Sequence, residues 1–146
     1  MKSKLFIILF ALVFIFCSCG KKENPNAKFV GTYSITDSWG SSNSLIGSGT
    51  LEYTLTITDD GEDGIILNNV NKTLDGIKAK VSNDSFMISK QTVNSKSGKT
   101  YDVDAKTGTL SNNTLRIDFG YNDIDYGNLI GYIYCIISGK KESSSK

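Results

Sequence analysis

The sequence predicts an all-β protein, an eight-stranded antiparallel up-and-down barrel after an N-terminal signal helix, on the strength of three observations. From residue 29 onward, apolar and polar residues repeatedly alternate with a period of two, the side-chain period of a half-buried strand. Polar segments rich in Gly, Asn and Asp separate these stretches, and such residues favour tight turns. Beyond the first 18 residues, no stretch shows the 3.6-residue period of an amphipathic helix.

Residues 1–18 are predicted to be a secretion signal. Two early lysines precede an apolar run at 5–16, which as a helix spans about 18 Å, less than the roughly 30 Å core of a bilayer. The following FCSC resembles the bacterial lipoprotein motif, in which a small residue precedes the modified cysteine. Ser18 precedes Cys19, whereas a bulky phenylalanine precedes Cys17. We therefore interpret residues 1–18 as a lipoprotein signal peptide and assign Cys19 as the lipidated residue. In that family this cysteine carries a diacylglycerol and usually a further acyl chain such as palmitate.

Residues 19–28 are interpreted as a lipidated tether, because they are almost entirely polar and contain the only proline. The nine residues after Cys19, if fully extended, reach about 30 Å at most. The resemblance to lipoproteins of Bacteroidota implies anchoring in the outer membrane. It leaves the periplasmic or surface-facing side open, since only one acidic residue, Glu23, closely follows the cysteine. An ordinary cleaved signal with incidental cysteines is the alternative. Residues 29–141 form the barrel domain and 142–146 a polar tail.

Composition excludes several functional classes. The net charge is +1 and Arg116 is the only arginine, so no basic surface for nucleic acid is expected. The absence of histidine removes Ser-His and Cys-His nucleophiles and histidine-bound metals. We assign no catalytic residue, cofactor or metal, and expect a non-enzymatic protein. Cys135, the one thiol left after processing and lipidation, is interpreted as a buried apolar residue.

The first two strands show the alternation most clearly. In residues 29–36 (FVGTYSIT) the odd positions carry Phe, Gly, Tyr and Ile. In residues 51–57 (LEYTLTI) the odd positions are apolar, while the even positions are Glu or Thr, which suit a solvated face. The segment between them, 37–48, is rich in Gly and Ser. We expect it to be a long connection that covers the outer face of the last strand.

The remaining six strands are each bounded by turn residues. They are 65–70, an apolar run; 77–81, alternating after Asp-Gly; 86–93, after Ser-Asn-Asp; 101–106, alternating with Asp; 115–121, alternating after Asn-Asn; and 129–138, apolar on both faces.

One hairpin can be predicted in register. A two-residue turn at 112–113 (Asn-Asn) places Leu110 opposite Leu115. Continued without interruption, that register would place a lysine opposite a core aromatic residue farther along. One extra residue restores the apolar pairing, so we predict a β-bulge near residue 107, tolerated by Gly108.

From 29 to 141 the chain is similar to lipocalin-like lipoproteins of Bacteroidota. The segment FVGTY (29–33) matches the first strand of that family, with Tyr33 at the aromatic position of its Gly-x-Trp pattern. The resemblance implies that Tyr33 closes one end of the barrel beneath a basic residue of the last strand, Lys140 or Lys141. It implies a lipocalin-like fold and does not identify a ligand.

The candidate ligand-binding residues are aromatic and, apart from Trp39, share the parity of the expected inner face. An eight-stranded barrel can be filled by such side chains or can hold one small ligand. Trp39, in the Gly/Ser-rich connection, is expected to be a lid or a plug. The set is Tyr33, Trp39, Tyr53, Phe86, Tyr101, Phe119 and Tyr121.

Two principal functions follow. The first is an outer-membrane-anchored, non-enzymatic barrel that binds a small apolar or amphipathic ligand. The second is a solid barrel or sandwich that contacts a protein or glycan at the cell envelope. A carboxylate hydrolase using Asp102, Asp104 and Asp118 is a distant third, because their parity places these aspartates on the solvated face. The acidic segment 59–64 resembles the start of a calcium loop, but we interpret it as a charged hairpin turn.

Overall fold

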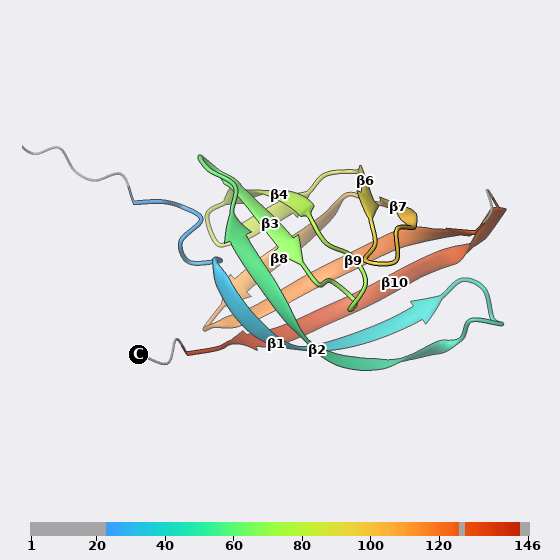
Figure 1. Cartoon of the computed structure of the whole chain (residues 1–146). Helices are drawn as coiled ribbons and strands as arrows, with labels where there is room; N and C mark the ends of the chain where they lie inside the picture. The colour runs from blue at the N-terminus through green and yellow to red at the C-terminus, as the bar shows by residue number, and fades with distance from the viewer. Residues whose placement is uncertain (1–22, 126–127, 144–146) are drawn as a thin grey trace, which may run out of the picture.

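The computed structural model describes residues 23–125 and 128–143, which contain ten strands and no helix (Figure 1). The predicted signal peptide and Cys19 lie outside the described residues. Within the described part of the chain there is accordingly no helix that could cross a membrane. The strands are β1 (Gly31–Ser41), β2 (Ser48–Asp59), β3 (Gly64–Asn68), β4 (Ile77–Ser82), β5 (Ser85–Ile88), β6 (Gln91–Asn94), β7 (Thr100–Val103), β8 (Lys106–Ser111), β9 (Thr114–Asp125) and β10 (Asn128–Lys141).

Eight of these strands close into an antiparallel barrel, which confirms the predicted fold class. Their order is β10-β1-β2-β3-β4-β5-β8-β9, and β9 pairs with β10 to complete the ring. The expected strand 86–93 is interrupted at 89–90, which divides it into β5 and β6. The stretch 100–111 is similarly divided into β7 and β8. The β6–β7 hairpin extends the wall by pairing with the second half of β9.

The period-two alternation places apolar residues inside the barrel. In β2, Leu55 and Ile57 are buried, while Thr54 is exposed and Tyr53 is partly buried. The buried apolar side chains come from strands around the ring and from residues 29 and 70–74, and they form one core inside the barrel. The largest are Tyr33, Phe29, Phe86, Leu55, Ile57, Ile65, Leu67, Leu74, Ile77, Ile88, Leu115 and Ile117.

The predicted β8–β9 hairpin is confirmed, and the extra residue lies next to the predicted position, but Gly108 does not have the role predicted for it. Leu110 lies opposite Leu115, and both turn asparagines have positive φ. The register changes by one residue between the Gly108–Ile117 pair and the Val103–Tyr121 pair. Strand pairing with β9 is interrupted at 104–107, which includes the predicted position, whereas Gly108 itself lies within regular pairing to both β5 and β9. Space is what requires glycine there, because a Cβ would lie 2.1 Å from Cζ of Phe86.

The expectation for residues 37–48 was also wrong. β1 continues to Ser41 and pairs with β10 on one side and β2 on the other, because hydrogen bonding on both edges outweighs the weak strand preference of Gly and Ser. Only 42–47 form the turn. The outer face of β10 is therefore not covered by this segment, and Tyr134 and Ile136 are exposed there.

The barrel has two distinct ends. We call the end at the start of β1 the lower end; it includes the 60–63, 83–84 and 112–113 turns. The upper end includes the 42–47 turn and the 69–76 loop. At the lower end, Tyr33 is buried and its hydroxyl donates to the Phe29 carbonyl at 2.7 Å; burial raises the pKa of Tyr33 to about 12. Lys141 lies opposite Tyr33 in register and donates to the Lys28 carbonyl.

Part of the predicted tether instead packs on this lower end. Asn26 is fully buried, and its amide Nδ2 donates to Asp59 Oδ1 at 2.7 Å and to the Gly64 carbonyl at 2.9 Å. The exposed Lys28 side chain forms an ion pair with Asp84 at 2.6 Å. Asn-Pro-Asn residues favour turns over extended chain, and this turn satisfies polar groups of the β2–β3 connection. The polar stretch 24–28 therefore belongs to the folded domain.

Candidate functional site

The upper end carries an unpaired strand edge. β2 has twelve residues, but β3 pairs only with the last four of them, Thr56 to Asp59. Beyond that point, no described strand adjoins the side of β2 that faces away from β1. In Figure 1 this part of β2 projects with β1 as a two-stranded ribbon beside β10. We call residues 48–53 on this side the β2 edge.

The geometry of the ladder shows which peptide groups the β2 edge exposes. Along an antiparallel strand, successive residues direct their N–H and C=O groups to opposite sides. The Thr54 carbonyl accepts from Asn69 Nδ2, and the Asp60 amide donates to the Gly64 carbonyl, so even-numbered residues face away from β1. The N–H and C=O groups of Thr50 and Glu52 therefore point out from the β2 edge.

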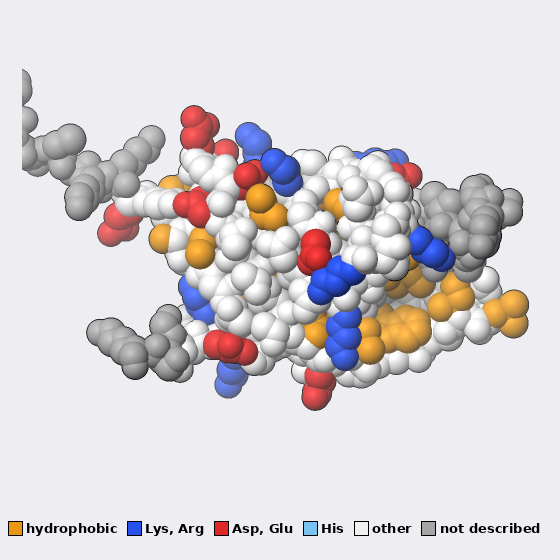
Figure 2. All heavy atoms as spheres, viewed as in Figure 1, with side chains coloured by type: hydrophobic (Ala, Val, Ile, Leu, Met, Phe, Trp, Pro, Cys, Tyr) orange, Lys and Arg blue, Asp and Glu red, His pale blue; other side chains and the backbone are white. Residues whose placement is uncertain are grey.

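The inner face beside this edge is apolar and only partly covered. Trp39, Leu51 and Tyr53 face the same side of the β1–β2 ribbon, and each is half-buried. The indole of Trp39 lies over Gly49, whose Cβ would be 3.1 Å from Nε1. Figure 2 shows hydrophobic side chains gathered along this ribbon, whereas in the rest of the view they are scattered among charged and other groups. We call the β2 edge together with Trp39, Leu51 and Tyr53 the upper site.

A buried polar cluster lies beneath the upper site. The Tyr53 hydroxyl donates to Asp37 Oδ2 at 3.2 Å, and Asn71 Nδ2 donates to the Tyr121 hydroxyl at 2.9 Å. Burial raises the pKa of Asp37, and hydrogen bonds from Tyr53 and the Cys135 thiol offset only part of that increase. Burial, with the nearby Asp37 charge, also raises the pKa values of Tyr53 and Cys135. Both groups are therefore protonated at neutral pH.

Two buried polar atoms in this region have no hydrogen-bond partner in the described part of the chain. They are Asp37 Oδ1 and Trp39 Nε1, an acceptor and a donor. A buried polar group without a partner destabilises the fold, by about 1–3 kcal/mol. If the covering side chains move, a bound molecule can donate a hydrogen bond to Asp37 Oδ1 and accept one from Trp39 Nε1.

The predicted ligand-binding residues separate into three groups. Tyr33 and Phe86 are buried at the lower end, where Phe86 meets Phe29 edge to face at 5.4 Å between ring centroids. Only Trp39 and Tyr53 reach the upper site. The third group, Tyr101, Phe119 and Tyr121, is buried inside the barrel. The Tyr121 ring lies 5.4 Å from the Tyr101 ring and 5.9 Å from the Phe119 ring, measured between centroids.

Sequence reasoning missed Asp37 and Asn71. Asp37 has the odd parity of Tyr33 and Ile35, so extension of the first strand by two residues would have shown an acid on the inner face. No comparable signal marks Asn71, because it lies in the β3–β4 connection and is placed by tertiary contacts.

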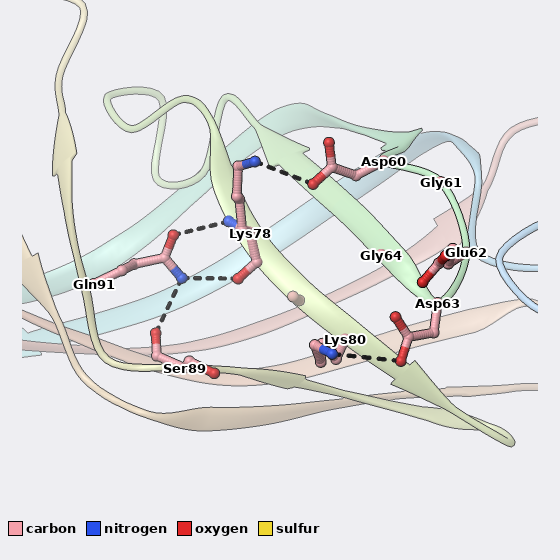
Figure 3. A pocket seen from close by; sticks show the side chains of 10 residues that line it. Asp60, Gly61, Glu62, Asp63, Gly64, Lys78, Lys80, Ser89 and Gln91 are labelled. Atoms are coloured by element: carbon pink, nitrogen blue, oxygen red, sulfur yellow. Dashed lines mark hydrogen bonds and ion pairs between the residues drawn. The ribbon is translucent and has the colours of Figure 1, made fainter.

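Two hollows on the described part of the chain are open grooves on the outer surface. One, of about 470 Å³, lies beside the β2–β3 turn and the outer face of β4 (Figure 3). Its charges pair internally, Lys78 with Asp60 at 3.2 Å and Lys80 with Asp63 at 3.7 Å. The Gln91 amide bridges the Lys78 backbone, accepting from its N–H and donating to its C=O. These polar groups already have partners, so the groove offers little for specific recognition.

A second outer hollow adjoins the upper site. It measures about 430 Å³ and lies over β1 and β2 next to the exposed Glu52. Its other lining residues are Ser34, Ile35, Thr36, Tyr53 and Thr54.

The acidic residues considered from sequence form local hydrogen bonds and ion pairs. Among the described residues, no group of three or more Cys, Asp or Glu side chains is arranged to hold a metal. Asp59 receives hydrogen bonds from Asn26, Asn24 and the Gly61 amide, which lower its pKa. At the barrel surface, Asp102 accepts from Thr92 and Asp118 pairs with Arg116.

Comparison with protein-family models, curated proteins and solved structures gives no match for this chain.

Proposed function

We propose that this is a lipid-anchored, non-enzymatic binding module of the outer membrane, whose solid barrel presents the upper site to a macromolecule of the cell envelope. The proposal rests chiefly on the contrast between a filled interior and a half-covered upper site. Most of the predicted aromatic residues pack against one another, whereas Trp39, Leu51 and Tyr53 keep accessible surface beside an unpaired strand edge. Exposed apolar surface rimmed by polar groups is typical of interaction sites.

The anchoring part of the proposal rests on sequence. The FCSC segment and the preceding apolar run support lipidation at Cys19. The resemblance to lipoproteins of Bacteroidota supports the outer membrane, with either side of that membrane compatible.

A small amphipathic ligand at the same end is the second candidate. The observation that favours it is the pair of unpartnered atoms, Asp37 Oδ1 and Trp39 Nε1, directly beneath the upper site. A molecule with a hydroxyl group and an apolar body would donate to Asp37 Oδ1, accept from Trp39 Nε1 and cover the indole.

Position-specific photo-crosslinking in the native cells tests the principal proposal. A benzophenone amino acid is placed at Leu45, which is 93 % exposed at the 42–47 turn, or, as a control, at Met87 on the outer face of β5, which is 59 % exposed. We expect an adduct at Leu45 that Leu51→Asp abolishes, and none at Met87. Equal labelling at both positions would contradict the proposal.

The second candidate is tested on the same full-length protein, released in mild detergent. Native mass spectrometry is expected to reveal a retained small molecule that is lost in the Trp39→Ala variant if a ligand is present. A protein with no added mass, combined with a position-specific adduct at Leu45, would favour the macromolecular partner.

A further inference from the structure

We propose that the partner of the upper site is an extended segment of another protein, which binds as an added strand along the β2 edge. This inference rests on the function proposed above and specifies its partner. The segment would alternate apolar residues with polar ones, and would carry a basic residue on its polar face.

The first argument comes from the backbone. The peptide groups of Thr50 and Glu52 face outward from β2, and no described strand pairs with them. An unpaired row of N–H and C=O groups is a template for strand addition. Glycans and small ligands do not reproduce the alternating donors and acceptors of a strand.

The second argument comes from the side chains. Leu51 and Tyr53 lie two residues apart on the inner face, with the Trp39 indole beside them. Because strand side chains alternate between faces, an added strand would set every second residue against this apolar surface. The partner segment should therefore carry apolar residues two positions apart.

The third argument is charge. Residues 37–58 contain two acidic residues, Asp37 and Glu52, and no lysine or arginine. Glu52 is exposed on the outer face of the β2 edge and borders the 430 Å³ hollow. A basic side chain opposite Glu52 on the added strand would meet this carboxylate, and opposite charges in cross-strand pairs are favourable.

Charge also argues against a second copy of this chain as the occupant. Antiparallel pairing of two β2 edges, centred between Thr50 and Glu52, places the two Glu52 carboxylates opposite or diagonal to each other on one face. Like charges in that arrangement are destabilising.

The test uses the full-length protein in detergent and Trp39 fluorescence, since Trp39 is the only tryptophan and lies at the site. The probe is the acetylated, amidated peptide TVKVTVKVT, and its control is TVEVTVEVT. We expect saturable binding of the lysine peptide, with weaker binding of the glutamate peptide. Amide exchange should slow at Thr50 and Glu52 when the lysine peptide is bound.

Two variants test the strand geometry. Thr50→Pro removes an outward N–H that β1 does not use, and proline is tolerated at such edge positions. We expect about fivefold weaker peptide binding, as for one lost hydrogen bond of ordinary strength. Glu52→Lys should reverse the preference between the two peptides by about tenfold or more. Tyr134→Ala, an exposed apolar truncation on β10, is the matched control and should leave binding unchanged.

The outcomes separate this inference from the proposed function. Unchanged binding by Thr50→Pro, or no binding of either peptide, would overturn strand addition. If maltohexaose alters Trp39 fluorescence while the peptides do not, the upper site binds a glycan, and only the strand inference is wrong. A concentration-dependent dimer that Thr50→Pro abolishes would identify a second copy as the occupant and overturn the choice of partner. Failure of peptides, maltohexaose and the Leu45 crosslink together would overturn both proposals.

Discussion

The ring of Phe86 occupies the space that a side chain at Gly108 would need, since a Cβ on Gly108 would lie 2.1 Å from Cζ of Phe86. The two residues are cross-strand partners of β5 and β8. Phe86 is also held edge to face against Phe29, so its ring has little freedom to move.

Gly108→Ala is therefore expected to destabilise the protein by about 1–3 kcal/mol, the usual cost of overpacking a core. Urea unfolding measures the change. The neighbouring exposed Thr109→Ala serves as the control. In the double variant Gly108→Ala/Phe86→Leu the loss should be smaller than the sum of the two single losses. Additive losses would mean that the contact does not determine the glycine.

Asn26→Ala is expected to cost about 1.5–3 kcal/mol, because it removes two buried hydrogen bonds, one of them to a carboxylate. Asn24→Ala, which removes one exposed hydrogen bond to Asp59, should cost less. Thermal or urea unfolding measures the loss of stability in each of the two variants. Equal effects would indicate that the segment before β1 is not held chiefly by Asn26.

The hydrogen bonds to Asp59 also predict a pH effect. Because they lower its pKa in the folded state, the stability they provide is present above the ordinary carboxyl pKa and is lost as pH falls through the lowered value. Asn26→Ala should therefore show a smaller loss of stability in acid than the wild type. A parallel pH profile for the two proteins would contradict this assignment.

Asp37 predicts the opposite pH dependence. Burial raises its pKa in the folded state, so the folded protein retains this proton to higher pH than the unfolded chain. The stability that Asp37 contributes to the fold should therefore fall as pH rises from the ordinary carboxyl pKa toward the raised pKa. Asp37→Asn should remove this decline and be more stable than the wild type at pH 7. Unfolding measured across pH, with the exposed Asp84→Asn as control, tests the sign.

Cys135 is expected to be chemically inert in the folded protein. It is buried, and burial together with Asp37 raises the pKa of its thiol, so little thiolate forms at neutral pH. In a Cys17→Ser/Cys19→Ser variant, a thiol reagent should react with Cys135 only at the rate of unfolding. Rapid reaction without denaturant would show that the upper end opens readily.

Cys19→Ala is expected to move the protein from the membrane fraction to the soluble fraction, or to trap the uncleaved precursor. Metabolic labelling with palmitate should be lost as well, while Cys17→Ala should retain both anchoring and label. Unchanged fractionation of Cys19→Ala would reject the assignment.

Much of the fold could be predicted because one face of each strand is buried, which makes period two visible in segments such as 51–57. The register of the β8–β9 hairpin followed from its asparagine turn, and the need for an extra residue followed from the apolar faces. The role of Gly108 did not follow from sequence, because it depends on Phe86 in another strand.

The site was less predictable for the same reason. Trp39 and Tyr53 were identified, but the β2 edge results from the shortness of β3, which sequence alone does not connect to residues 48–53. The docking of Asn26 depends on backbone carbonyls of a turn, which have no sequence signature.

The packing of residues 24–28 on the barrel has a consequence for orientation. Asn24 follows Cys19 by only five positions, and an extended chain covers at most about 3.6 Å per position, or about 18 Å in all. A barrel moored by that sulfur would stand with its Tyr33 end close to the lipid headgroups. The Trp39 end would then face the aqueous compartment, where a passing partner, rather than the bilayer, could reach it.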